Sequence, residues 1–119
     1  MRIIVETIDK LMEEDKKYRK KPIENIYIVG DFNVEDRDPM FQILTESKYK
    51  FVSARHIADT YDADVTTFHG FKGSEYQEIT IIDHIFFSST KAVTKFKVLR
   101  GEAPYISDHY PVITDFFKV

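Results

Sequence analysis

The first apolar residues of the chain recur at the spacing of an amphipathic helix. One face carries Ile4, Ile8, Leu11 and Met12, and the opposite side carries charge pairs spaced i to i+4 (Glu6/Lys10, Glu13/Lys17 and Asp15/Arg19). The basic run at residues 16–21 complements the C-terminal end of the helix dipole, and Pro22 prevents continuation. The pattern predicts a helix over residues 2–19, with the basic run as its solvated end rather than a nucleic-acid patch.

A continuous apolar run from Ile26 to Val29 predicts a strand that is buried on both faces. Gly30 is expected to break this strand, which leaves Asp31 and Asn33 at its C-terminal end, where open α/β sheets bind ligands. A carboxylate followed by an amide offers a metal ligand or general base together with a hydrogen-bond donor for an anionic oxygen. On this stretch alone, a strand followed by an Asx-type turn explains the same residues.

Two short elements are expected next. Asp38 and Pro39 have the character of a helix N-cap and first helical residue, and the apolar residues that follow predict a short helix through Leu44. Residues 51–54 favour a short strand or an extended link. These elements leave a polar segment before the next apolar run.

Residues 55–65 are expected to be irregular, and they end in an acidic pair, Asp62 and Asp64. This pair is compatible with a metal site, but a solvated loop is the simpler interpretation. The aromatic segment that follows carries Phe68 and His69. Taken alone, such a histidine is more often a loop residue hydrogen-bonded to the backbone than a ligand.

The strongest alternation of the chain runs from residue 79 to 88. One face would carry Ile79, Ile81, Asp83, Ile85 and Phe87, and the other Thr80, Ile82, His84 and Phe86. Asp83 therefore projects from an apolar row, where an unpaired carboxylate would cost on the order of several kcal/mol. A buried salt bridge is the ordinary explanation, but the neighbouring sequence supplies no Arg for it.

Residues 93–100 alternate in the manner of a half-exposed strand. Lys95 and Lys97 are expected to point outward, and Phe96 and Val98 inward. A last strand is expected towards the C-terminal end of the chain.

Asp108 and His109 lie in the loop before this last strand. Alone, an Asp-His dipeptide in a loop predicts a turn. Together with Asp31 and Asp83 at the ends of other strands, the adjacent histidine favours a catalytic constellation.

Composition narrows the class of protein. The 119 residues, of which 43% are hydrophobic, suit a single domain over residues 1–119. The net charge of −3 provides no global positive field, so a phosphate-bearing substrate would need local cations or a metal ion. The absence of Cys excludes disulfides, thiol nucleophiles and Cys-ligated zinc. Without a membrane-length apolar run or a signal-peptide pattern, the chain is expected to be soluble and cytoplasmic, although a longer form could be secreted.

Four segments resemble one known family when taken in order. They are Gly30-Asp31-Phe32-Asn33, Thr67-Phe68-His69-Gly70-Phe71, Ile82-Asp83-His84-Ile85-Phe86 and Ser107-Asp108-His109-Tyr110-Pro111-Val112. Together they resemble the endonuclease/exonuclease/phosphatase family. The resemblance implies an α/β fold: half of a four-layer α/β sandwich, with a mixed, mostly antiparallel sheet flanked by helices. It also implies hydrolysis of phosphodiester or phosphomonoester bonds with a divalent metal.

The resemblance implies catalytic roles for four residues. Asp31 would orient or deprotonate the attacking water or hold a metal, and Asn33 would donate to a phosphate oxygen. Asp83 would pair with His109 and favour the protonated ring, which can stabilise a pentacovalent phosphate.

The resemblance also implies metal and substrate residues. Asp108, with Asp31, would contribute to a site for Mg²⁺ or Mn²⁺, whose charge neutralises the developing negative charge. Phe68 and His69 lie in a loop that the family places at the substrate cleft, which gives them a weaker substrate-binding role. The expected substrates are phosphate esters, whether nucleic acids, nucleotides or phosphorylated headgroups.

The matching segments all correspond to the C-terminal half of the family's domain. The family's N-terminal half supplies an Asn, the principal metal-binding Glu and another His, whereas Glu6, Glu13, Glu14 and Glu24 lie on the first helix or its exit. Ile81 stands where relatives often carry Arg. Weak metal binding is therefore expected, from an excised piece, a truncated gene product or part of a split protein. The alternative is a non-catalytic interaction module derived from such an enzyme.

A missing half would leave one sheet face uncovered. This face would contain Ile81, Ile85 and Phe87, or else Ile82 and Phe86. Exposed apolar patches larger than a few hundred Å² are unusual on soluble monomers. The sequence therefore predicts a homodimer that buries on the order of 1,600 Å², or association with the missing N-terminal half.

Overall fold

A computed structural model describes residues 2–19, 21, 23–62, 64–88 and 91–118. The elements of the first half are α1 (Arg2–Asp15), β1 (Tyr27–Asp31), α2 (Pro39–Glu46), β2 (Val52–Ser53), α3 (Ala54–Ile57) and β3 (Thr60–Tyr61). Those of the second half are the 3₁₀ turn η1 (Gly73–Glu75), β4 (Asp83–Phe87), β5 (Lys91–Val98) and β6 (Val112–Lys118). The expected α/β class is confirmed.

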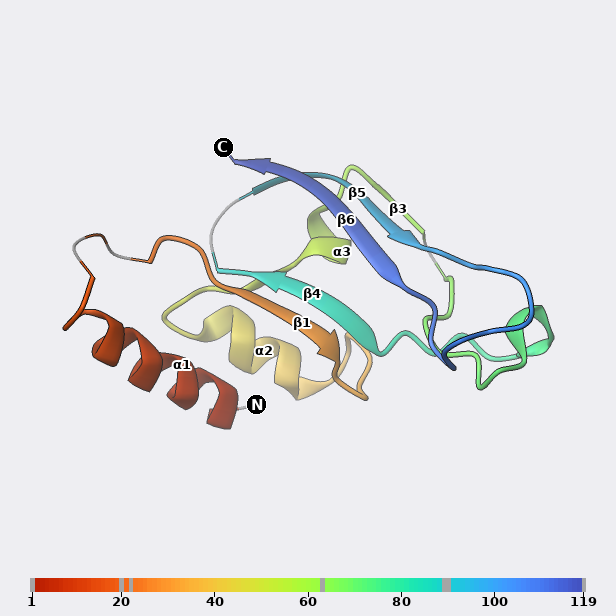
Figure 1. Cartoon of the computed structure of the whole chain (residues 1–119), viewed down its shortest axis with the longest axis horizontal. Coiled ribbons are helices and arrows are strands. Elements are labelled where there is room, and N and C mark those ends of the chain that lie inside the picture. The colour runs from red at the N-terminus through yellow and green to blue at the C-terminus, as the bar shows by residue number, and fades with distance from the viewer. Residues whose placement is uncertain (1, 20, 22, 63, 89–90, 119) are drawn as a thin grey trace.

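The strands form two small sheets that face each other (Figure 1). One has the order β1-β4-β2, with antiparallel pairing throughout, and the other has the order β3-β5-β6, with β3 parallel to β5. Between them lies an inter-sheet core, whose buried members are Ala54, Phe87, Val93, Phe96, Val98 and Tyr110. The expected inward orientation of Phe96 and Val98 is confirmed.

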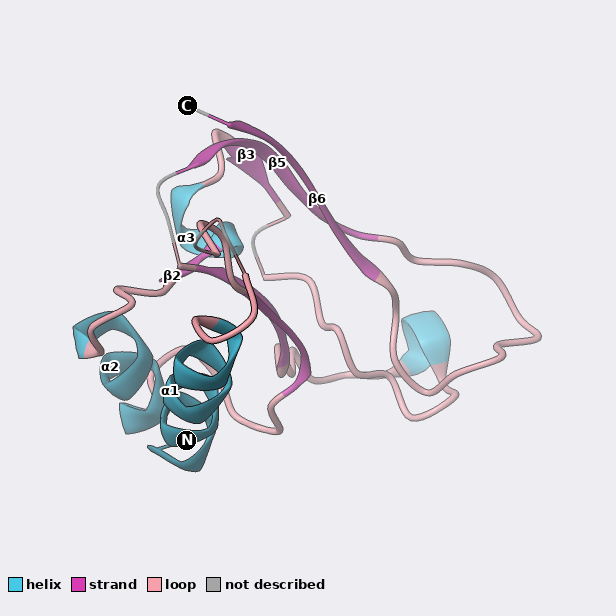
Figure 2. Ribbon diagram, turned by 60° about the vertical axis from the view of Figure 1, so that its left-hand side comes forward, coloured by secondary structure: helices cyan, strands magenta, loops and turns pink. Residues whose placement is uncertain are grey.

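Helices α1 and α2 cover the other face of the first sheet (Figure 2). They enclose a helix-side core, whose buried members are Met40, Phe41, Leu44, Phe51 and Phe86. The N-terminal signals of α2 act as expected, because Asp38 Oδ1 accepts the Met40 N–H at 2.9 Å and Pro39 occupies the first turn. None of the helices in the described part of the chain has the length and apolar character needed to cross a bilayer.

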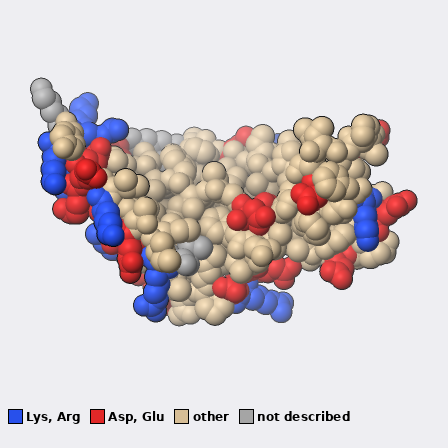
Figure 3. Space-filling view, turned by 60° about the horizontal axis from the view of Figure 1, so that its bottom comes forward, with Lys and Arg blue, Asp and Glu red and all other residues tan. Residues whose placement is uncertain are grey.

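The first helix is shorter and more exposed than its pattern indicates. It ends at Asp15, and residues 16–18 form a turn in place of the last helical turn. Val5 and Ile8 pack against the helix-side core, but Leu11 is 61% exposed. Figure 3 shows that acidic and basic side chains are mixed over α1.

The prediction of an uncovered face on the 79–88 strand is wrong. Both faces of β4 are covered within this chain, one by the second sheet and the other by the helices. Phe87 lies in the inter-sheet core and Phe86 in the helix-side core. Ile85 packs against the inter-sheet core, Ile82 is buried, and Ile81 is half-buried.

The strand at 26–29 also differs from its prediction. It runs through Gly30 to Asp31, because Gly30 adopts φ +147° and stays paired with His84. It is an edge strand, and Val29 is 64% exposed while Tyr27 is also exposed, so it is not buried on both faces. Exposed apolar residues of the described sheets belong to edge strands, for example Val29 on β1 and Phe117 on β6, and not to β4.

Two segments have structure that their sequences do not indicate. Residues 55–65 contain most of α3 and all of β3, and β3 exists because it pairs with β5 about 35 residues later. Asp62 is not a free acidic ligand, since its Oδ2 accepts the Val98 N–H at 2.8 Å. Conversely, residues 79–82 lie outside β4, which begins at Asp83.

Candidate active site

The centre of the site is a hydrogen-bonded pair, Asp83 and His109. Asp83 is the first residue of β4, and His109 lies in the loop before β6. Nδ1 of His109 lies 2.8 Å from Oδ2 of Asp83, and a carboxylate only accepts, so Nδ1 carries the proton. The Asp83 side chain is 14% exposed and the His109 side chain is 23% exposed. This histidine supplies the partner that an Asp in an apolar row requires.

Two further carboxylates surround the same imidazole. Asp31 ends β1 directly opposite Asp83 in the antiparallel register. Its Oδ2 lies 3.6 Å from Nε2 of His109, and Oδ1 of Asp108 lies 3.8 Å from the same nitrogen. The structure therefore brings together the four ionisable residues that the sequence singled out, from three separate parts of the chain.

The acidic surroundings raise the pKa of His109 above its ordinary value. Burial of the ring opposes the positive charge, but the hydrogen bond and charge of Asp83, with the charges of Asp31 and Asp108, outweigh it. The imidazolium is thus favoured at a point where a phosphate oxygen could approach Nε2. This is the arrangement needed to stabilise negative charge on a substrate.

The segment after β1 is held in place by local contacts. Asn33 has φ 55°, and its backbone N–H donates to Asp31 Oδ1 at 2.8 Å, which is an Asx turn. Buried His84 lies close to the carbonyl oxygen of Val34, with 2.8 Å between its Nε2 and that oxygen. Burial lowers the pKa of His84. The Asx turn therefore forms one part of the site, because it orients Asp31 and leaves Asn33 exposed beside it.

Phe68 and His69 lie close to the pair in different ways. The Phe68 ring contacts the His109 ring, with centroids 5.3 Å apart. His69 is fully buried, with its ring centroid 4.6 Å from that of Tyr105 and 4.2 Å from that of Tyr110. In this arrangement Phe68 borders the site directly, whereas the His69 ring lies behind it among aromatic side chains. A substrate role for either residue stays a prediction.

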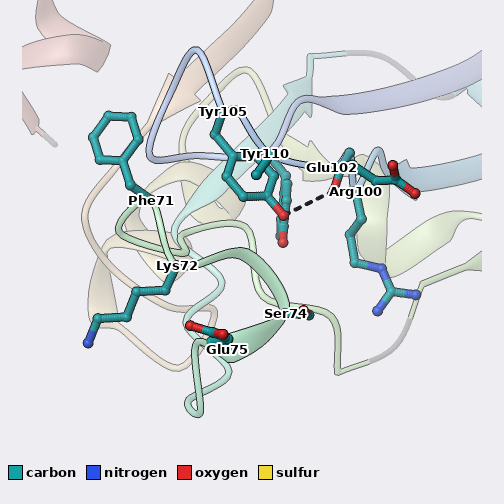
Figure 4. Close-up of a pocket in the computed structure, with 10 residues that line it drawn as sticks. Phe71, Lys72, Ser74, Glu75, Arg100, Glu102, Tyr105 and Tyr110 are labelled. Carbon is teal, nitrogen blue, oxygen red and sulfur yellow. Dashed lines mark hydrogen bonds between the residues drawn. The ribbon is translucent and has the colours of Figure 1, made fainter.

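A cavity of about 700 Å³ lies beside these aromatic residues (Figure 4). Its wall combines Tyr105 and Tyr110 with charged side chains from η1, from the residue before η1 and from the loop after β5 (Lys72, Glu75, Arg100 and Glu102). The Tyr105 hydroxyl donates to the Gly101 carbonyl oxygen at 3.1 Å, drawn as the dashed line in Figure 4. The charged residues of this wall carry no signal in the sequence, because they come together only when the two loops meet.

The donor set of the site suits a hard divalent cation. Ligand atoms of Asp31, Asp83 and His109 all lie within 4.8 Å of one another, with Asp108 adjacent to the ring. Carboxylate oxygens are the ligands that Mg²⁺ and Mn²⁺ prefer. The group formed by Asp31, Asp83 and His109 therefore fits a divalent metal ion.

Comparison with known proteins identifies the fold. No protein-family model and no curated protein matches the chain. Among solved structures, an endonuclease/exonuclease/phosphatase from Bacteroides vulgatus superposes with a TM-score of 0.72 at 24% identity, over 95% of this chain and 42% of that one. The chain has the fold of part of an endonuclease/exonuclease/phosphatase domain.

Two other solved structures agree with the endonuclease/exonuclease/phosphatase fold. A mannosyl-6-phosphatase from Bacteroides thetaiotaomicron has a TM-score of 0.70 at 24% identity, over 96% of this chain and 44% of that one. An endonuclease/exonuclease/phosphatase family protein from the same species has a TM-score of 0.70 at 25% identity, over 94% and 42%. The chain therefore spans less than half the length of the structures that it matches.

Proposed function

We propose that this chain contributes a catalytic site for the metal-dependent hydrolysis of phosphate esters. The observation that carries the proposal is the Asp83–His109 pair at 2.8 Å, with Asp31 on the opposite side of the imidazole. Three carboxylates lie around one partly buried imidazole. The protonated imidazole can donate to a phosphate oxygen, and the carboxylates can offer oxygen ligands to a metal ion at the same place.

The residues would divide the chemistry among them. Asp83 holds the His109 ring through Nδ1 and keeps it protonated, so that Nε2 donates to a phosphate oxygen and stabilises its growing charge. Asp31 orients a water molecule or accepts its proton, and the exposed Asn33 amide donates to another phosphate oxygen. A bound Mg²⁺ or Mn²⁺, held by Asp31 and Asp108, would supply further charge neutralisation.

The proposal is tested by two measurements on the chain itself. Mn²⁺ is paramagnetic, so binding should broaden the amide resonances of Asp31 and Asp108 before those of distant residues. With Mg²⁺ or Mn²⁺ present, slow hydrolysis of p-nitrophenyl phosphate or bis-p-nitrophenyl phosphate should be lost in Asp83→Asn and in His109→Gln. The exposed helix variant Glu6→Gln is the control and should match the parent chain.

A second candidate function is that of a non-catalytic interaction module. It is favoured by exposed apolar residues on two of the edge strands, which include Val29 on β1 and Ile113 and Phe117 on β6. Metal-independent background hydrolysis, together with no selective Mn²⁺ broadening, would support this function and contradict the catalytic one.

Both functions call for a partner at these edges, and we propose a homodimer or the remainder of a domain of this fold. Edge strands carry backbone groups ready to pair with another chain. Sedimentation of the chain at micromolar concentration should show dimers, and Val29→Lys should shift them to monomers. A monomer at every concentration would exclude the homodimer and leave the remainder of the domain as the partner.

A further inference from the structure

Thr67 is fully buried beside the segment that leads into β4. Its backbone N–H donates to the Thr80 carbonyl oxygen at 3.0 Å. Its hydroxyl oxygen accepts the N–H of Ile82 at 3.0 Å and the N–H of Asp83 at 3.3 Å. The hydroxyl therefore contacts the backbone of the carboxylate residue on which the active-site histidine depends.

The carbonyl group of Thr67 contacts the backbone next to His109, the other member of the pair. It accepts the N–H of Tyr110, the residue after His109, at 2.7 Å. The next residue, Phe68, forms an isolated β-bridge with His109. One buried residue thus bonds directly to the backbone on both sides of the Asp83–His109 contact, although these two residues are 26 positions apart.

We propose that Thr67 is a positioning residue for the Asp83–His109 pair, an inference that rests on the proposed function of that pair. The hydrogen bond between the pair depends steeply on distance and angle, so the two segments must be held in register. The carbonyl contact of Thr67 is available to any residue type. The contact to the Asp83 N–H requires a hydroxyl at this position, because a buried N–H without an acceptor is unfavourable.

The test compares two Thr67 variants with the parent chain by NMR of isotope-labelled protein, and it needs no turnover. Thr67→Val keeps the shape but removes the hydroxyl, and Thr67→Ser keeps the hydroxyl. Thr67→Val should accelerate hydrogen exchange at the Asp83 amide about tenfold or more, as expected for the loss of one buried hydrogen bond. It should also weaken or shift the downfield signal of the His109 Nδ1 proton. Thr67→Ser should retain both signatures of the parent chain.

Thr66→Val is the matched control. Thr66 is also a threonine with three hydroxyl contacts, which reach Phe68 and Thr80 but neither member of the catalytic pair. Its replacement should lower the melting temperature without changing the His109 proton signal. The inference is overturned if Thr67→Val retains the parent signal, or if Thr66→Val loses it equally.

A further variant keeps the test decisive if Thr67→Val does not fold. Thr67→Cys has a side chain of similar size and a weaker acceptor. It should give an intermediate exchange rate at Asp83 and a shifted His109 proton, and an unchanged His109 proton would overturn the inference. If the chain also hydrolyses phosphate esters, Thr67→Val should lower kcat with little change in KM. A failure of hydrolysis in all variants contradicts the proposed function and leaves these NMR outcomes unaffected.

Discussion

Replacement of Asp83 by Asn should measure how much the hydrogen bond between Asp83 and His109 contributes to the free energy of unfolding. The change preserves shape but removes the charge that faces Nδ1 of His109 across 2.8 Å. Hydrogen bonds to charged groups contribute about 1.5–3 kcal/mol to stability. Because both side chains here are less than a quarter exposed, screening by solvent reduces this contribution only slightly. We expect the free energy of unfolding to fall by about 2 kcal/mol at pH 6.

The effect should depend on pH with a defined sign. The pKa of His109 is raised in the folded chain, so the ring binds its proton more tightly when folded. The resulting stabilisation is fully present below the unfolded pKa of about 6.5, and it is lost as the pH rises through the raised folded value. The parent chain should therefore become less stable above about pH 6.5, and Asp83→Asn should flatten this dependence.

Thermal unfolding in metal-free buffer between pH 6 and pH 9 provides the assay. For a domain of this size, 1 kcal/mol corresponds to roughly 4 °C in melting temperature, so a difference of about 8 °C is expected at pH 6. A double-mutant cycle with His109→Gln isolates the pair from other effects of each change. A difference below about 2 °C, or the same pH dependence in both proteins, would refute the assigned pairing.

Three further predictions concern other parts of the chain. Gly73→Ala should lower the melting temperature much more than Gly101→Ala, because Gly73 has φ 58° and its added Cβ would collide with the Tyr105 ring, whereas Gly101 has open space; equal effects in calorimetry would contradict this. Leu44→Ala in the helix-side core should lower the free energy of unfolding in urea by about 2–5 kcal/mol, because it leaves a cavity. A decrease below about 1 kcal/mol would show that neighbouring side chains fill that cavity. Asp31→Asn should weaken Mn²⁺ binding about tenfold or more by calorimetric titration, and an unchanged affinity would remove Asp31 from the metal site.

Parts of this fold that depend on neighbouring residues could be predicted from the sequence. The cap at Asp38 and Pro39 is local, and so is the alternation that buries Phe96 and Val98. The candidate catalytic residues stand out in the sequence because their segments resemble a known family, and not because any pattern reveals their distances. Alternation did show that Asp83 needed a partner, but it could not identify His109.

The remaining features depend on contacts between distant segments. Whether the 26–29 strand is central or at an edge is decided by its neighbours in the sheet, and the apolar residues alone cannot report this. Strand β3 exists only through its pairing with β5, so its polar sequence predicts a loop. Residues 79–82 alternate like a strand, yet the Thr80 carbonyl oxygen is bonded by the loop at residues 66–68 in place of a strand partner.

Strand β4 gives the two members of the catalytic pair unequal resistance to local opening. Because Phe86 lies in one core and Phe87 in the other, neither core can open without disturbing the strand that begins at Asp83. The His109 N–H, in the loop before β6, donates to the Ser107 hydroxyl oxygen of the same loop at 3.1 Å, a contact that a local opening can break. Amide exchange at Asp83 should therefore require a larger opening of the fold than amide exchange at His109. If the pair binds a phosphate ester as proposed, Asp83 is its more fixed member and the imidazole is the member that can adjust.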